Sequence, residues 1–239
     1  MEEPTFNSYI DGYNLYYGAL EDNPNYKWLD LLSLSKALVP NGKLGKVYYF
    51  TARVKERFPG DGDGRRQHAY LRALEATGVE IVLGDFRKDE RWLRVAANPT
   101  DSFLSPEPTR MLGLTKLALK RSFKVAHPDH PRAFVYKMTE KGSDVKLASY
   151  LLRDCFASGM KDSLVITGDS DLVTPILFSV NAGMNVRVVV PSQVQYADSL
   201  ERVSTSFSRL NPELLAANQL PKSVIRGKGS TITRPNTWA

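Results

Sequence analysis

The chain has 239 residues, of which 42% are hydrophobic and 24% are charged. This composition excludes collagen-like, fibrous and wholly disordered proteins, and it indicates one large globular domain with an insertion or a tail. The single cysteine, Cys155, excludes an internal disulfide, and three histidines leave little for a histidine-built metal centre.

No apolar stretch approaches the roughly 20 residues that a membrane-spanning helix needs. The first four residues, Met1 to Pro4, lack the basic start of a signal peptide. We therefore expect a cytoplasmic protein without a membrane partner.

The net charge of +6 is distributed unevenly. From Arg87 to Arg132, ten lysines and arginines face five acids, and four basic residues between Leu214 and the end face none. Such stretches attract polyanions, nucleic acids first, although surface lysines and arginines are most often only solubilising. Charge alone leaves nucleic-acid binding open.

Short apolar, β-branched segments alternate along the chain with segments of helical period. We predict strands at 6–10, 46–52, 79–83, 133–136, 164–167 and 185–190. We predict helices at 28–38, 65–77, 144–157, 172–181 and 197–203. Ser143 is the predicted N-cap of the helix at 144–157. This alternation predicts an α/β protein with three α/β/α layers, Rossmann-like, around a mostly parallel sheet of about five to six strands.

Two regions depart from this pattern. Prolines interrupt a basic insertion at 87–132, which holds one predicted helix at 111–121 and could serve as a lid, a homodimer contact or a substrate clamp. The main domain is expected to span 1–210. The basic tail at 211–239 has little to bury, so we expect it to be flexible.

Acidic residues follow three of the predicted strands. Asp11 ends the first strand, Asp144 begins the helix after 133–136, and Asp169 and Asp171 follow 164–167. Because the carboxyl ends of parallel strands meet at one edge of a sheet, we expect these side chains to converge.

Helix capping explains Asp144, Asp169 and Asp171 when each is taken singly. It does not explain Asp11, which no predicted helix follows directly. Four neighbouring carboxylates repel each other unless a cation neutralises them. A ligand set made only of oxygen atoms suits Mg²⁺ or Mn²⁺.

Three motifs, at 10–15 (IDGYNL), 140–145 (EKGSDV) and 167–173 (TGDSDLV), together resemble the signature blocks of the NYN domain family, a PIN-like group of nucleases. The resemblance spans roughly residues 6 to 205. It implies a PIN-like α/β/α domain with Mg²⁺- or Mn²⁺-dependent ribonuclease activity. The implied catalytic residues are Asp11, Asn14, Asp144, Asp169 and Asp171, and the implied metal ligands are the four aspartates.

In such an enzyme the bound cations stabilise charge on the phosphate and lower the pKa of the attacking water. We expect RNA, rather than DNA, as the partner, and a single strand rather than a duplex. Basic, aromatic and polar residues near the acids are predicted to hold it: Tyr13, Arg53, Lys141, Lys146, Thr167 and Ser170. Tyr16 and Tyr17 could also stack on bases.

Two alternatives stay open. Asp169 to Val173 also fits the nucleophile loop of a phosphatase that forms an aspartyl phosphate, although about two thirds of the chain precedes it. A domain that keeps the acidic pocket could instead serve as a non-catalytic RNA-binding or regulatory adaptor.

Overall fold

The computed structural model describes residues 4–54, 60, 62–94, 123–124, 132–191 and 198–238. The chain divides into two compact units, one made of Met1–Phe86 with Glu140–Ala239 and the other of Arg87–Thr139. The helix predicted at 111–121 lies outside the described residues. Within the described ranges, no helix combines the length and the apolar character that crossing a lipid bilayer requires.

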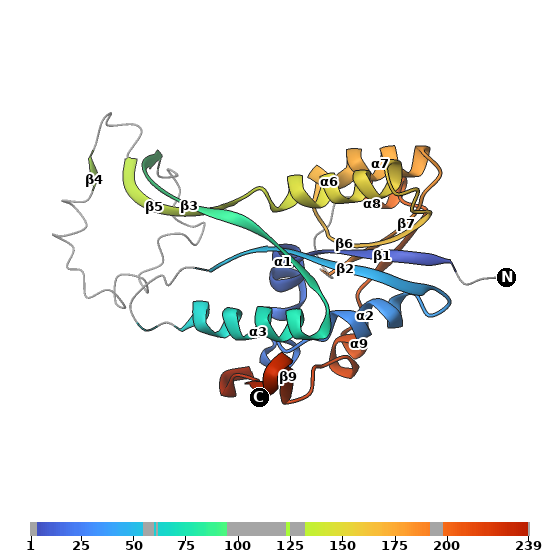
Figure 1. The fold of residues 1–239 in the computed structure, drawn as a ribbon. Helices are drawn as coiled ribbons and strands as arrows, with labels where there is room; N and C mark the ends of the chain where they lie inside the picture. Colours follow the sequence, from blue (N-terminus) through green and yellow to red (C-terminus); the bar gives the residue numbers. More distant parts are fainter. Residues whose placement is uncertain are drawn as a thin grey trace. The chain divides into compact units, whose positions relative to one another are not determined.

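The first unit is built on a parallel sheet (Figure 1). Its strands are ordered β3-β2-β1-β6-β7-β8, and every neighbouring pair is parallel. They are β1 (Thr5–Asp11), β2 (Lys43–Ala52), β3 (Glu80–Arg94), β6 (Asp162–Ile166), β7 (Asn185–Val190) and β8 (Ser206–Arg209).

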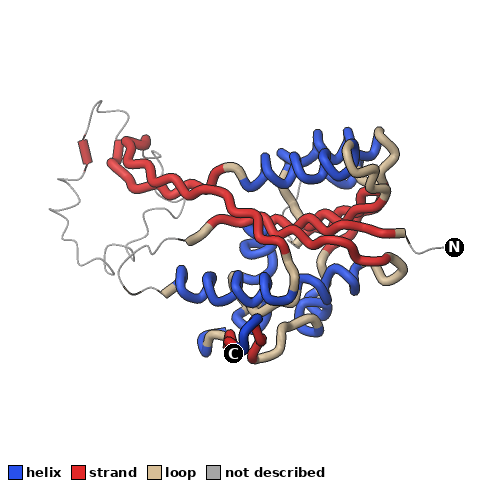
Figure 2. Tube along the Cα trace, viewed as in Figure 1, coloured by secondary structure: helices blue, strands red, loops and turns tan. Residues whose placement is uncertain are grey.

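Helices cover both faces of this sheet (Figure 2). One face carries α2 (Leu31–Leu38), α3 (Asp63–Thr77) and α9 (Pro212–Ala217), and the other carries α6 (Ser143–Phe156), α7 (Val173–Asn181) and α8 (Asp198–Val203). The prediction of three α/β/α layers around a mostly parallel sheet is confirmed.

Two hydrophobic cores separate the layers, because alternate residues of a strand point to opposite faces. On β1, Phe6 and Ile10 are buried in the core that includes α2 and α3, whereas Tyr9 is buried in the core that includes α6 and α7. On β6, Ile166 lies in the first core and Val165 in the second. The strands are therefore apolar on both faces, as a covered parallel sheet requires.

In the second unit, β4 (Phe123–Lys124) pairs with β5 (Arg132–Lys141) in antiparallel fashion. The third predicted strand ended too early, at Leu83, since β3 continues to Arg94. Beyond Gly84 its sequence is mostly charged, which hid the strand from the sequence pattern. Its backbone nevertheless has a partner strand, because β5 lies next to β3 in the sheet.

The C-terminal segment 211–239 is not the flexible tail that its composition predicted. After α9 it forms a hairpin of β9 (Ser223–Arg226) and β10 (Ser230–Thr233), in which Val224 and Ile232 face each other. Both are buried in the core beneath α2 and α3, and the Trp28 indole N–H donates to the carbonyl of Pro221 at 2.9 Å. Few apolar side chains are enough to hold this segment against the domain, because the hairpin places them on one face.

Two helix starts also differ from their predicted positions. α2 begins at Leu31 rather than residue 28, and Asp30 caps it by accepting from the backbone N–H groups of Leu32 and Ser33. The N-cap of α6 is Gly142, not Ser143, with a φ of 92° that a glycine adopts without strain.

A buried carboxylate joins β1 to α6. Asp154 accepts hydrogen bonds from the Asn7 amide at 2.9 Å and from the Tyr9 hydroxyl at 2.7 Å. Its other oxygen pairs with the Arg153 guanidinium. Burial and the adjacent carboxylate raise the pKa of the Tyr9 hydroxyl well above its ordinary value, so Tyr9 serves as a donor.

We predict that Asp154→Ala lowers the free energy of unfolding by about 2 to 4 kcal/mol, because it leaves buried donors without an acceptor. Chemical denaturation measures this loss. Asp22→Ala, which removes an exposed carboxylate, is the control and should change stability by less than about 0.5 kcal/mol. Equal effects of the two substitutions would contradict the role given to Asp154.

Candidate functional site

Asp11 ends β1 and caps the helix that follows it. The prediction that no helix follows Asp11 is wrong, since α1 (Gly12–Leu15) and a single π-helical segment, η1 (Tyr16–Leu20), begin at once. One Asp11 oxygen accepts from the Asn14 backbone N–H at 2.9 Å, and the other accepts from the Asn14 side-chain amide at 2.7 Å. A four-residue helix is too short to show a helical period in the sequence.

Thr167 and Asn14 tie the end of β1 to the end of β6. The Thr167 hydroxyl donates to Asp11 at 3.0 Å and accepts from the backbone N–H of Asp169 at 3.1 Å. The Asn14 side-chain oxygen accepts from the backbone N–H of Gly168 at 3.1 Å. β1 and β6 are paired in the sheet, so residues 156 positions apart share one hydrogen-bond network.

Burial raises the pKa of the Asp11 carboxyl, which is only 2% exposed. The hydrogen bonds from Asn14 and Thr167 oppose this shift because they stabilise the carboxylate, whereas the negative charge of Asp169 adds to it. Asp11 thus lies within electrostatic reach of the acids on the neighbouring loop.

Three of the four predicted aspartates converge. Asp144 lies in the first turn of α6, Asp169 caps the 3₁₀ turn η3 (Ser170–Leu172), and Asp171 lies within that turn. One carboxylate oxygen of each lies within 4.8 Å of the others. Among the described residues, this group has the geometry to hold a metal ion, and Asp11 is not part of it.

The other predicted site residues are less tightly gathered. Arg53, Lys141 and Ser170 are exposed, after β2, at the end of β5 and in η3 respectively. The Lys146 ammonium donates to the backbone carbonyl of Leu83. Thr167, predicted to hold substrate, is fully buried and bonds Asp11 instead.

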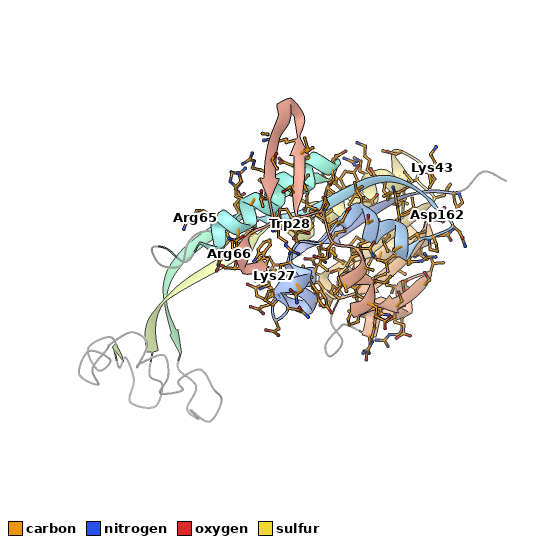
Figure 3. The ribbon with its side chains drawn as sticks, turned by 90° about the horizontal axis from the view of Figure 1, so that it is seen from below. Lys27, Trp28, Lys43, Arg65, Arg66 and Asp162 are labelled. Atoms are coloured by element: carbon orange, nitrogen blue, oxygen red, sulfur yellow. The ribbon has the colours of Figure 1, made fainter. Side chains whose placement is uncertain are left out.

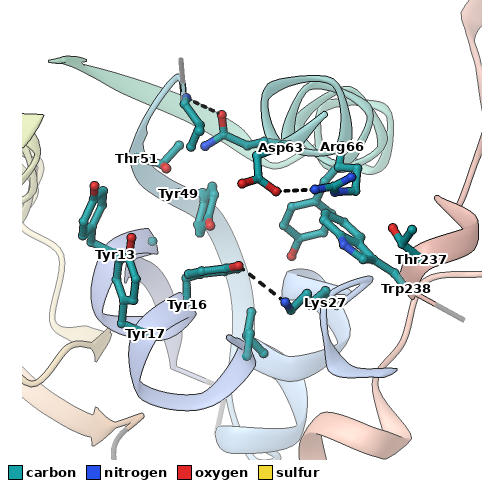
Figure 4. A pocket seen from close by; sticks show the side chains of 15 residues that line it. Tyr13, Tyr16, Tyr17, Lys27, Tyr49, Thr51, Asp63, Arg66, Thr237 and Trp238 are labelled. Carbon is teal, nitrogen blue, oxygen red and sulfur yellow. Dashed lines mark hydrogen bonds and ion pairs between the residues drawn. The ribbon is translucent and has the colours of Figure 1, made fainter. Parts of the chain in front are cut away.

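Next to Asp11 lies a cavity of about 280 Å³ that sequence reasoning did not find (Figure 4). Its walls come from α1, η1, β2, α3 and the C-terminal residues. Six of its lining residues are aromatic: Tyr13, Tyr16, Tyr17, Tyr49, Tyr70 and Trp238. The tyrosines at positions 13, 16 and 17 were the part of the cavity wall that the sequence grouped together. The other walls come from segments that lie far from them in the chain.

The rings of the wall contact one another in two groups, one from α1 and η1 and the other from β2, α3 and the C-terminal residues. The Tyr13 and Tyr17 centroids are 5.1 Å apart, those of Tyr16 and Tyr17 are 5.2 Å apart, and Trp238 meets Tyr70 edge-on at 6.0 Å. Tyr49 is buried at the cavity's floor, where burial first and the Asp11 charge second raise the pKa of its hydroxyl. The cavity and the Asp11 network are therefore adjacent.

Gly12 lies between the cavity and the hydrogen-bond network of Asp11. It lines the cavity directly after Asp11, and a Cβ atom at this position would lie 2.7 Å from the Phe50 carbonyl oxygen and 2.8 Å from the Tyr49 ring. The close approach of α1 to β2 thus requires glycine here.

We predict that Gly12→Ala lowers the free energy of unfolding by about 1 to 3 kcal/mol, since the backbone of β2 must move to admit the methyl group. Gly227→Ala is the matched control, because a Cβ there meets nothing within 4 Å. Thermal or chemical denaturation compares them. A tolerated Gly12→Ala with unchanged stability would contradict the described packing of α1 on β2.

Comparison with known proteins gives one structure and one relative. No family model matches the sequence, so the resemblance to the NYN domain family stays a prediction. A crystal structure of a protein of unknown function from Vibrio parahaemolyticus covers 88% of this chain and 97% of its own, at 14% identity and a TM-score of 0.48.

The sequence is similar to that of 6-hydroxy-3-succinoylpyridine 3-monooxygenase HspA from Pseudomonas putida. The two are 30% identical over 256 aligned positions, which cover 96% of this chain and 74% of that protein. A monooxygenase is an oxidoreductase, so the prediction of a metal-dependent ribonuclease is wrong, as are its phosphatase and adaptor alternatives. The carboxylates at the strand ends indicated where a site could lie. The fold and the position of these residues do not specify which reaction takes place there. The chain belongs to the family of enzymes that includes the 6-hydroxy-3-succinoylpyridine 3-monooxygenase HspA.

Proposed function

We propose that this chain is an oxidoreductase that inserts one oxygen atom into a small hydroxylated heteroaromatic ring. The observation that supports this most is the 30% identity, over 96% of the chain, with a monooxygenase whose name gives a hydroxypyridine as its substrate. The ring would bind in the tyrosine-lined cavity beside Asp11.

The cavity suits such a ring in size and in chemistry. Its volume of about 280 Å³ lies just below the usual range for ligand pockets, so it favours a small molecule over a polymer. Aromatic rings pack well in offset or edge-to-face contact with other rings, and six lining residues offer those contacts.

The reaction balances with two further reactants. One oxygen atom of O₂ is inserted into a C–H bond of the ring to give a hydroxyl group, and the other leaves as water after taking two electrons and two protons from a two-electron donor and solvent. The residues of this chain would bind the ring, orient it and exclude water. The buried Tyr49 side chain also lines the cavity, and its hydroxyl would hydrogen-bond a polar group of the ring.

The predicted cation site becomes part of this proposal. Asp144, Asp169 and Asp171 offer oxygen ligands only, which fits Mg²⁺ or Mn²⁺. Such an ion would neutralise the mutual repulsion of the three carboxylates. The predicted RNA partner and homodimer stay untested predictions.

Oxygen-18 labelling tests the proposed reaction. Purified protein is incubated with 6-hydroxy-3-succinoylpyridine, ¹⁸O₂, NADH and free flavin, and the product is analysed by mass spectrometry. We expect one ¹⁸O atom in each product molecule and none when the label is in water. Product without ¹⁸O from O₂, or no product, would refute the proposal.

Replacing an aromatic side chain of the cavity wall tests whether the substrate binds in the cavity. Tyr17→Ala removes a half-exposed wall residue and should raise KM about 3- to 10-fold, the equivalent of one aromatic contact. Phe178→Ala, which removes an exposed ring from α7, should leave KM unchanged. Similar KM values for both variants and the unmodified enzyme would place substrate binding elsewhere.

Calorimetric titration with Mn²⁺ tests the cation site. We expect Asp169→Asn and Asp171→Asn each to weaken Mn²⁺ binding at least about 10-fold, because each removes a charged ligand. Asp22→Asn is the control at an exposed position. Binding that is unchanged in the site variants, or absent from the unmodified protein, would refute the site.

A further inference from the structure

Lys27 is a cation on the wall of an otherwise aromatic cavity. It follows the 3₁₀ turn η2 (Pro24–Tyr26) and is half-buried. Its ammonium lies 5.3 Å from the centre of the Tyr16 ring and 3.4 Å from the Tyr16 hydroxyl oxygen. Figure 4 shows the Tyr16 hydroxyl directed at this ammonium.

The charge of Lys27 is not balanced by a carboxylate. Throughout the part of the chain that the structure describes, Lys27 makes no ion pair. The other charged lining residues, Asp63 and Arg66, form an ion pair with each other. Among the described residues that line the cavity, one positive charge is therefore in excess.

An anionic ligand would stabilise a half-buried cation in this position. Partial burial removes water from the ammonium, and the neutral Tyr16 ring and hydroxyl compensate only in part. The surplus charge and the aromatic walls share one cavity (Figure 4), so a single ligand that has both a ring and an anionic group satisfies both. Figure 3 labels Lys27 in the view of the whole chain.

We propose that the Lys27 ammonium is the group that binds the carboxylate of an aromatic or heteroaromatic ligand in this cavity. This inference rests on the proposed function and names the residue that would recognise the anionic end of the substrate. One lysine offers a single point charge, which suits a carboxylate, whereas phosphate groups are usually met by several donors. The Arg66 guanidinium is a weaker candidate because Asp63 already occupies it.

The test measures binding separately from turnover. Isothermal titration compares 6-hydroxy-3-succinoylpyridine with its carboxamide, which has nearly the same shape and no charge. We expect the unmodified protein to bind the acid about 10-fold or more tightly than the amide, the size of one charge-assisted hydrogen bond. Added salt should weaken binding of the acid alone.

Three variants identify the residue. Lys27→Gln should bind acid and amide equally, while Lys27→Arg should keep most of the preference for the acid. Lys36→Gln, which removes an exposed charge from α2, should behave like the unmodified protein. Thermal unfolding of each variant establishes that the fold is intact.

Equal binding of acid and amide by the unmodified protein would overturn the proposal, as would a full preference for the acid in Lys27→Gln. The oxygen-18 experiment tests the proposed oxygenase function independently of the role proposed for Lys27. Oxygen insertion without any effect of Lys27 would refute only the role of Lys27. A preference lost in Lys27→Gln, in a protein that inserts no oxygen, would support the anion site and refute the oxygenase.

Discussion

The parallel pairing of β1 with β6 is the constraint on which the site depends. It brings the Thr167 hydroxyl to the Asp11 carboxylate, and the Asn14 amide completes the network by bridging Asp11 and Gly168. A buried carboxylate is stable only when its oxygens accept hydrogen bonds, and here they accept three. The network therefore holds α1 at a defined angle to the sheet.

The position of α1 determines two neighbouring features. On one side, Asp11 and Asn14 face the loop of Asp169. On the other, Tyr13 and the tyrosines of η1 form the cavity wall, and Gly12 allows the close contact with β2. The C-terminal residues complete that wall, because the β9–β10 hairpin packs into the core beneath α3 and leads to Trp238. The acids and the aromatic cavity are thus parts of one region of the first unit.

The correction of the nuclease prediction has a physical reason. Carboxylates at the ends of parallel strands converge in many α/β proteins, because the topology brings those ends together. Convergence indicates a place where ligands bind and where a cation could be held, but several kinds of reaction use such a place. The proposal of a small heteroaromatic ligand rests instead on kinship with a monooxygenase and on the size and aromatic walls of the cavity.

The sequence by itself determined the layer order, most strands and helices, and the convergence of Asp144, Asp169 and Asp171, because hydrophobic periodicity and strand-end position are local signals. It did not predict α1, because four residues are too few to show a helical hydrophobic period. It also did not predict the C-terminal hairpin, because the few apolar residues there form a buried face only after the two strands pair. The cavity also depended on the tertiary structure. Lys27, Tyr49, Tyr70 and Trp238 lie far apart in the chain and meet only because the sheet, α3 and the hairpin bring them together.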